Sequence, residues 1–273
     1  MTTGAEKLTS PAPSQREPST DFWARANLVG DYAGGELRPV EAEIMDRHRE
    51  ALGGRVLELG VGAGRVTRHL CVVAKEVHGI DVSDAMVAAT RRVCPGATIA
   101  RGDLQDLSAY EDASFDAVVA AFNVIDVLGH DHRLAALGGF RRVLAPGGLL
   151  IMSSHNRAAA GSVVGPGRQL IGHLRAGRMR NAAGGVIRLP RRAANRRRLR
   201  PLEQEQPGYS ILNDSAHDYS ILHYYISRDA QAGQFAEHGF ELIECLDLEA
   251  VAVEAGEPAA RSPELHYVAR RHG

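Results

Sequence analysis

The feature that most constrains this fold is a short apolar run followed at once by closely spaced glycines. Residues 56–59 have the composition of a buried parallel strand. Gly60, Gly62 and Gly64 follow where the chain must turn sharply into a helix. The free N–H groups at the start of that helix can bind a polar or anionic ligand. The pattern therefore predicts a strand, a glycine turn and a helix, with a ligand at the turn.

A second strand, expected over 76–80, ends in Asp81, 21 residues after Gly60. In a doubly wound sheet an acid at this position reaches the ribose hydroxyls of a bound nucleoside. The dinucleotide fingerprint G-x-G-x-x-G is not met, because its third glycine position holds Arg65. The spacing G-x-G-x-G favours a nucleoside ligand without a pyrophosphate and disfavours a nicotinamide-dependent oxidoreductase.

With Glu58 before the glycines, the segment resembles the first motif of the class I S-adenosylmethionine-dependent methyltransferases, an acid followed by G-x-G-x-G. Later segments resemble the family's further motifs in order, over 99–107, 115–130, 142–156 and 223–270. The resemblance implies an α/β fold: a doubly wound, Rossmann-like sheet of seven strands with helices on both faces. The sheet would be mostly parallel, with an antiparallel last strand.

The resemblance implies S-adenosyl-L-methionine as cofactor and S-adenosyl-L-homocysteine as product. Asp103 would bind the adenine amine, with Leu104 beside the ring, and Glu58 would bind the amino group of the methionine part. The expected cofactor contacts are Glu58, Gly60, Gly62, Gly64, Asp81, Val82, Asp103, Leu104, Phe122 and Asn123.

His155 is the first candidate for a catalytic base. It lies in SSHN, at the carboxyl end of the expected fifth strand, where the methyl acceptor must bind. Imidazole accepts a proton near neutral pH. A histidine that only satisfies a strand end is the alternative. His223 and Tyr32 are the second candidates, and no metal site is expected.

Composition limits the organisation of the chain. A length of 273 residues with 44% hydrophobic content fits one domain, expected over 21–273 with an N-terminal helical lid over 21–52. Residues 1–20, rich in Pro, Ser and Thr, are expected to form a mobile tail and not an export signal. No apolar run is long enough to cross a membrane. Three scattered cysteines fit a cytoplasmic protein without disulfides.

An arginine-rich insertion is expected over 157–222. Residues 157–200 hold twelve arginines and no acid, although the whole chain carries a formal charge of −1. Three interpretations stay open: a solvated segment, a lid over an anionic substrate, and a nucleic-acid surface. The third is weakened because no aromatic side chain for base stacking occurs between Arg168 and Arg200.

The sequence thus predicts methyl transfer from S-adenosylmethionine to an O or N nucleophile of a small molecule, in natural-product metabolism. Nucleobase methylation is disfavoured because AAFNVID, after the fourth strand, lacks the family's Asn/Asp-Pro-Pro-aromatic clamp. An RNA or protein methyltransferase docking through the arginine block, and a non-catalytic cofactor-binding module, are the alternatives. A membrane or nucleic-acid partner is not expected, whereas an anionic acceptor and a homodimer are left open.

Overall fold

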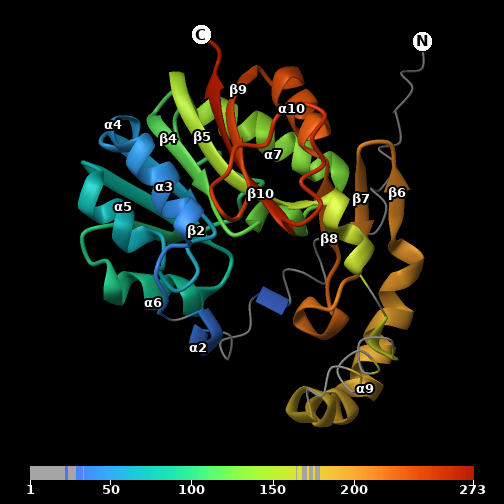
Figure 1. Cartoon of the computed structure of the whole chain (residues 1–273). Coiled ribbons are helices and arrows are strands. Elements are labelled where there is room, and N and C mark those ends of the chain that lie inside the picture. Colours follow the sequence, from blue (N-terminus) through green and yellow to red (C-terminus); the bar gives the residue numbers. More distant parts are fainter. Residues whose placement is uncertain are drawn as a thin grey trace, which may run out of the picture.

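The computed structural model describes residues 22–23, 29–32, 34–163, 165–167, 171, 175 and 179–273. The predicted tail over 1–20 lies outside these residues. A single sheet runs through the molecule in the order β3-β2-β1-β4-β5-β8-β7-β6, and β10 pairs with β5 and with β9 (Figure 1). The strands are β1 (Arg55–Leu59), β2 (Glu76–Asp81), β3 (Thr98–Arg101), β4 (Phe115–Ala120), β5 (Leu144–Asn156), β6 (Gln204–Gln206), β7 (Tyr209–Leu212), β8 (His223–Ile226), β9 (Phe240–Leu246) and β10 (Glu264–Arg271).

The predicted α/β class is confirmed. Strands β1 to β5 are parallel where they pair with one another, and β9 and β10 close the sheet as an antiparallel pair. The sheet has more strands than the seven expected, because β6 and β7 of the insertion, and β8 directly after it, extend the sheet. The insertion thus continues the sheet, which its arginine-rich composition did not indicate.

Helices cover both faces of the sheet (Figure 1). One face carries α3 (Pro39–Arg47), α4 (Arg49–Leu52), α5 (Thr67–Val73) and α6 (Asp84–Val93). The other carries α7 (His130–Val143) and α10 (Arg228–Glu237), whose Phe140 and Phe235 are fully buried against the strands. Apolar side chains spaced at helical intervals therefore anchor each helix to the sheet. Among the helices described, none combines the length and apolarity that a membrane crossing needs.

Several helices begin where the sequence supplies a cap. Ser83 accepts a hydrogen bond from the Met86 amide at the start of α6, and Ser227 accepts one from the Ala230 amide at the start of α10. Pro39 occupies the first turn of α3. These caps fix the points at which the chain leaves β2 and β8. They thereby fix the positions of the polar residues at the ends of those strands.

Strand β8 has a special place in the sheet. It pairs in parallel with only the last two residues of β5, His155 opposite Tyr225 and Asn156 opposite Ile226. The β10 strand already occupies the other edge of β5 over the same stretch. Consequently β8 pairs with the same edge of β5 as β4 does, but beyond the carboxyl end of β4. Its side chains therefore lie at the rim of the sheet, where ligands bind in doubly wound folds.

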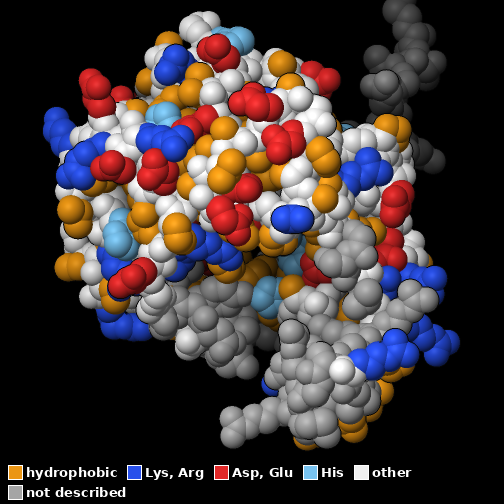
Figure 2. All heavy atoms as spheres, in the orientation of Figure 1, with side chains coloured by type: hydrophobic (Ala, Val, Ile, Leu, Met, Phe, Trp, Pro, Cys, Tyr) orange, Lys and Arg blue, Asp and Glu red, His pale blue; other side chains and the backbone are white. Residues whose placement is uncertain are grey.

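The rest of the insertion contains the short 3-10 helices η3 (Arg157–Ser162), η4 (Arg200–Leu202) and η5 (Ala216–Tyr219), and the long helix α9 (Met179–Leu199). Arg192 of α9 pairs with Asp218 at 2.6 Å, and Arg196 pairs with Glu203. Other arginines of α9 face outward, as Figure 2 shows along the lower right of the molecule. Part of the arginine block therefore stabilises the insertion itself.

Candidate active site

The glycine turn after β1 has the backbone that only glycine adopts readily. Gly60 has φ of +71° and Gly62 has φ of +54°. A Cβ atom on Gly60 would lie 2.4 Å from the Val124 side chain, so this glycine is required for packing. At Gly62 no described atom lies within 4 Å of such a Cβ. A ligand can therefore approach the backbone closely at Gly62.

Asp81, at the end of β2, faces the same turn. Its carboxylate accepts hydrogen bonds from the Gly62 amide and the Ser83 amide, each at 2.9 Å. Burial raises the pKa of this carboxyl above its usual value, although the amide donors act in the opposite direction. The structure thus brings Asp81 and the glycine turn together, and the binding of a ribose by Asp81 stays a prediction.

Glu58 points into the protein beneath the turn. Its side chain is only 3% exposed, and the Oε2 atom has no hydrogen-bond partner among the residues that the structure describes. Burial raises its pKa to about 8. A buried acceptor without a donor is costly, and a ligand ammonium group would satisfy it. The residues present therefore fit the methionine amino group of S-adenosylmethionine.

The remaining predicted cofactor residues lie around this rim. Asp103 follows β3 and accepts a hydrogen bond from the Gln105 amide, and Leu104 packs into the core beside it. Val82 is half-buried directly after Asp81. These positions are compatible with adenine contacts, which stay a prediction.

The turn after β4 is unusual, because two residues in succession have a left-handed backbone. Phe122 and Asn123 both have φ of +57°. The Asn123 amide donates to Ser153 Oγ at 2.8 Å, and its side chain donates to Glu264 Oε2 at 2.9 Å. Phe122 is 46% exposed and lies beneath the guanidinium group of Arg38 at 4.5 Å. The turn is thus fixed by hydrogen bonds while the Phe122 ring faces outward.

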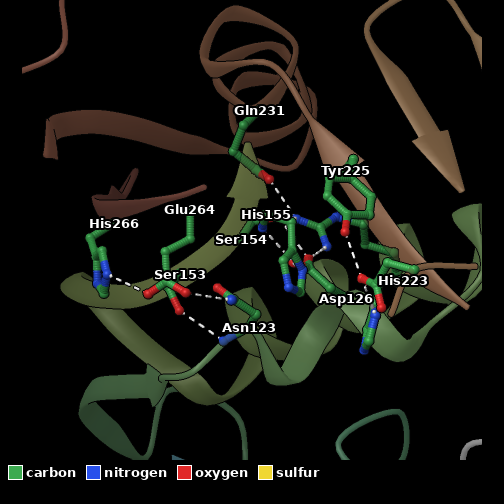
Figure 3. A network of polar contacts seen from close by, with 12 residues as sticks. Asn123, Asp126, Ser153, Ser154, His155, His223, Tyr225, Gln231, Glu264 and His266 are labelled. Carbon is green, nitrogen blue, oxygen red and sulfur yellow. Dashed lines mark hydrogen bonds and ion pairs between the residues drawn. The ribbon is translucent and has the colours of Figure 1, made fainter. Parts of the chain in front are cut away.

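His155 is held by an aspartate that lies four residues after Phe122. Asp126, in η2 (Val124–Val127), accepts hydrogen bonds from the His155 backbone amide at 2.6 Å and from Nδ1 at 2.7 Å. The other carboxylate oxygen of Asp126 accepts from Arg133 and from Ser154, each at 2.6 Å. Because Nδ1 is the donor to Asp126, Nε2 of a neutral His155 is free to accept a proton. Figure 3 shows this network.

His223 has an aspartate of its own. Its Nδ1 lies 2.8 Å from Asp214 Oδ2, which also accepts from the Tyr225 hydroxyl at 2.6 Å. The negative charge of Asp214 raises the pKa of His223 despite complete burial, and that histidine holds the pKa of Asp214 well below its ordinary value. The rings of His155 and His223 are 5.0 Å apart. Two histidines predicted from distant parts of the sequence therefore lie side by side, each oriented by a carboxylate.

Tyr32, the third predicted catalytic residue, belongs to the short helix α2 (Val29–Tyr32). Its side chain lies outside the described part of the structure, so its role stays a prediction.

His155, Asp214 and His223 also form a group that metals can use, with one ligand atom of each within 4.8 Å of the others. However, Asp214 already accepts hydrogen bonds from His223, Tyr225 and the Ala216 amide. These contacts suit a proton-transfer site at least as well as a metal site. The expectation of no metal is unchanged by this geometry.

Sequence reasoning missed Asp126, Arg133 and Asp214. A signal for Asp126 was available, because it is an acid in the turn after the fourth strand that already contained Phe122 and Asn123. Arg133 lies on α7, where a charged residue ordinarily faces solvent, and no pattern in the insertion distinguished Asp214.

The chain is similar to known proteins both in sequence and in fold. Residues 56–148 match the family model of a methyltransferase domain. A ubiquinone biosynthesis O-methyltransferase of Xanthomonas oryzae pv. oryzae is 28% identical over 149 residues, which cover 51% of this chain and 61% of that protein. The chain thus matches less than two thirds of this relative's length.

Two solved structures share the fold. The CcbJ methyltransferase of Streptomyces caelestis is 20% identical with a TM-score of 0.60, covering 92% of this chain and 98% of that one. The 1,6-didemethyltoxoflavin-N1-methyltransferase of Burkholderia thailandensis, solved with S-adenosylhomocysteine, is 13% identical with a TM-score of 0.59, covering 97% and 94%. The matched domain, the fold and the glycine-turn motif together support a class I S-adenosylmethionine-dependent methyltransferase.

Proposed function

We propose that this chain transfers the methyl group of S-adenosylmethionine to an oxygen or nitrogen nucleophile of a small molecule. The observation that carries the proposal is the segment after β4, where Asn123 and Asp126 are three residues apart. Asn123 borders the expected cofactor site, and Asp126 orients His155. One short turn thus connects the residues expected at the methyl donor with the residue expected at the acceptor.

The residues of the cofactor half would bind and orient. Asp81 would exchange its amide contacts in part for the ribose hydroxyls, and the Gly62 backbone would lie against the ligand. Glu58 would bind the methionine ammonium group through its unpartnered oxygen. When bound, S-adenosylmethionine supplies a methyl group already activated by the sulfonium charge. Catalysis therefore depends mainly on alignment and on exclusion of water.

His155 would complete the acceptor half as general base. The aspartate fixes the ring so that Nε2 is the proton acceptor, in the manner of an oriented catalytic histidine. The His155 side chain is 22% exposed, so an acceptor can reach it. A nucleophile that carries a proton could lose it to His155 as its lone pair attacks the methyl carbon.

The proposal includes a metabolic role and a cellular location. We place the reaction in natural-product metabolism and in the cytoplasm. The first is supported by the resemblance to small bacterial enzymes of this family that vary in the segment after the fifth strand. The second is supported by Cys71, Cys94 and Cys245, which are all free thiols.

Calorimetry with S-adenosylmethionine and S-adenosylhomocysteine tests the cofactor assignment. Asp81→Ala should bind both about tenfold to hundredfold more weakly, as expected for losing hydrogen bonds to a charged group worth about 1.5–3 kcal/mol. Asp84→Ala is the matched control, because Asp84 is an exposed acid three residues further on. Equal affinities for wild type and Asp81→Ala would remove the ribose role, and no binding to the wild type would end the proposal.

Exposed arginines on α9 favour one second candidate, an RNA methyltransferase that docks through this helix. Arg191, Arg197 and Arg198 are exposed near its C-terminal end. Such docking would show a steep salt dependence and little sequence preference. Replacing these three residues by alanine should abolish RNA binding if the candidate is right. RNA binding that is absent from the wild type would dismiss it.

A further inference from the structure

Aromatic rings gather beside the two histidines of the acceptor half. The ring of His155 is 5.0 Å from that of Tyr225, and the ring of His217 is 6.2 Å from that of His223. The ring of His217 also lies near two rings from the N-terminal segment, at 4.4 Å from Phe22 and 5.0 Å from Trp23. The faces of Phe, Tyr and Trp rings attract cations, and aromatic clusters of this kind bind ammonium groups.

Two carboxylates lie behind the histidines, and only one of them has an arginine partner. Asp126 is balanced by Arg133, and both of these side chains are fully buried. Asp214, by contrast, has His223 as its only ion-pair partner in the described chain. The nearby arginines of α9 are engaged elsewhere, since Arg192 pairs with Asp218 and Arg196 with Glu203. Protonated His223 balances Asp214, and the cluster carries one uncompensated negative charge once His223 has lost its proton.

We infer that the acceptor is a small aliphatic amine that enters the site as an ammonium ion. An ammonium group offers N–H donors to the Nε2 atoms of the histidines, and its charge compensates that of Asp214 when His223 is neutral. A carboxylate or phenolate acceptor would instead be repelled by the Asp214 carboxylate, which has no arginine partner among the described residues. The inference rests on the proposed methyl transfer and names its substrate class. It runs against the anionic acceptor that the arginine block left open in the sequence.

The histidines can accept the proton that an ammonium ion must lose before its nitrogen is methylated. An ammonium ion has no lone pair, so it must first lose a proton, which the neutral imidazole of His155 or His223 accepts. The freed nitrogen lone pair then forms the bond to the methyl carbon. The electrons of the breaking carbon–sulfur bond go to the sulfonium sulfur, which becomes neutral, and the positive charge passes to the methylated amine. Asp214 stabilises the protonated form of His223 and acts through that histidine, so it is a positioning residue.

A panel of matched acceptors tests the substrate class. Purified full-length protein would be incubated with S-adenosylmethionine and with benzylamine, benzyl alcohol, phenol or benzoate, and with short alkyl amines and the corresponding alcohols and acids. Release of S-adenosylhomocysteine and methylated product would be measured. We expect turnover with amines at least about tenfold above that with any oxygen nucleophile. Preferred turnover of phenols or acids, or a panel without any methylated amine, would overturn the inference.

The second measurement is the pH dependence of kcat/KM with an amine that the protein has been found to methylate. The charged and titratable groups facing His223 are Asp214 from the preceding loop, Tyr225 on its own strand, His155 from β5, Asp126 from η2 and His217 from η5. In the wild type, kcat/KM should rise with pH as His223 loses its proton, in a range above the ordinary histidine pKa. Asp214→Asn should move this rise to lower pH and reduce kcat/KM by about 10²-fold. Asp112→Asn, an exposed acid paired with Arg142, is the control.

Failure of this inference and failure of the proposed function give different results. If calorimetry shows cofactor binding that depends on Asp81 while amines are not methylated, only the acceptor class is wrong. If Asp214→Asn leaves the pH profile in place, the proton-accepting role of His223 is wrong. If the wild type binds no S-adenosylmethionine, both proposals fail together.

Discussion

Arg133 and Asp126 form an ion pair that is sealed from solvent, with Nη1 and Oδ1 2.6 Å apart and neither side chain exposed. Arg133 also donates to Ser154, Gln231 and Gln234, so its guanidinium group is fully engaged in the network of Figure 3. Such a pair adds little net stability, because desolvation offsets the attraction. Its effect is to hold Asp126 in the charged form beneath His155.

Removing one partner of this pair should be costly. Arg133→Ala leaves a buried, uncompensated carboxylate, and we expect it to lower the free energy of unfolding by about 3–5 kcal/mol. Urea denaturation followed by circular dichroism measures the change. Arg101→Ala, which breaks an exposed pair with Asp84, should change the same quantity by less than about 1 kcal/mol. A similar loss in both variants would contradict the role given to Arg133.

His155→Ala removes the proposed base while leaving the cofactor residues intact. With an amine acceptor, kcat should fall by about 10²-fold or more, whereas the affinity for S-adenosylhomocysteine should stay within about twofold. Steady-state kinetics and calorimetry measure the two effects. His272→Ala, at an exposed histidine near the C-terminus, is the control. An unchanged kcat would show that His155 is an ordinary strand-end histidine.

The two glycines of the turn should respond differently to alanine. A methyl group on Gly60 would clash with Val124 at 2.4 Å and would strain a backbone with φ of +71°. At Gly62 only the backbone strain applies, because no described atom lies near the added carbon. We expect Gly60→Ala to lower the free energy of unfolding by about 2–4 kcal/mol and Gly62→Ala by about 1 kcal/mol. Chemical denaturation distinguishes the two variants, and the reverse order would contradict this packing.

Glu58 should make the stability of the cofactor-free protein depend on pH. Burial raises its pKa to about 8 from the ordinary value of 4.5, so the folded protein keeps a proton that the unfolded chain releases between these limits. The free energy of unfolding should therefore fall as pH rises from about 4.5 to about 8. Glu58→Gln should lack this part of the slope and bind S-adenosylmethionine more weakly. Glu50→Gln, an exposed acid in α4, should leave both properties unchanged.

The sequence predicts the cofactor half well because its signals are local. The spacing of Gly60, Gly62 and Gly64 after an apolar strand, and of Asp81 after the next, follows from backbone geometry and the parallel sheet. Their arrangement in the structure agrees with those expectations, although their ligand roles stay predictions. The sequence predicts the position of His155 at the end of the fifth strand, but it does not predict that His223 lies beside it.

The acceptor half could not be derived in full, because its contacts join distant segments. Asp214 and His223 meet His155 because β8, directly after the insertion, pairs with the edge of β5 beyond β4. The arginines of the insertion dominate its composition and carry no information about strand pairing. From the sequence alone, Arg133 is predicted to lie on the exposed face of an amphipathic helix, and only the network around Asp126 shows that it is buried.

The pairing of β8 with just two residues of β5 has a consequence for how such an enzyme diversifies. The matched methyltransferase domain ends at residue 148, before His155, Asp214 and His223 occur in the chain. Exchange of the segment between β5 and α10 would replace the proposed acceptor-facing wall and leave the loops that are predicted to bind the methyl donor untouched. New acceptors could thus be acquired by grafting one contiguous stretch of sequence onto an unaltered methyl-donor module.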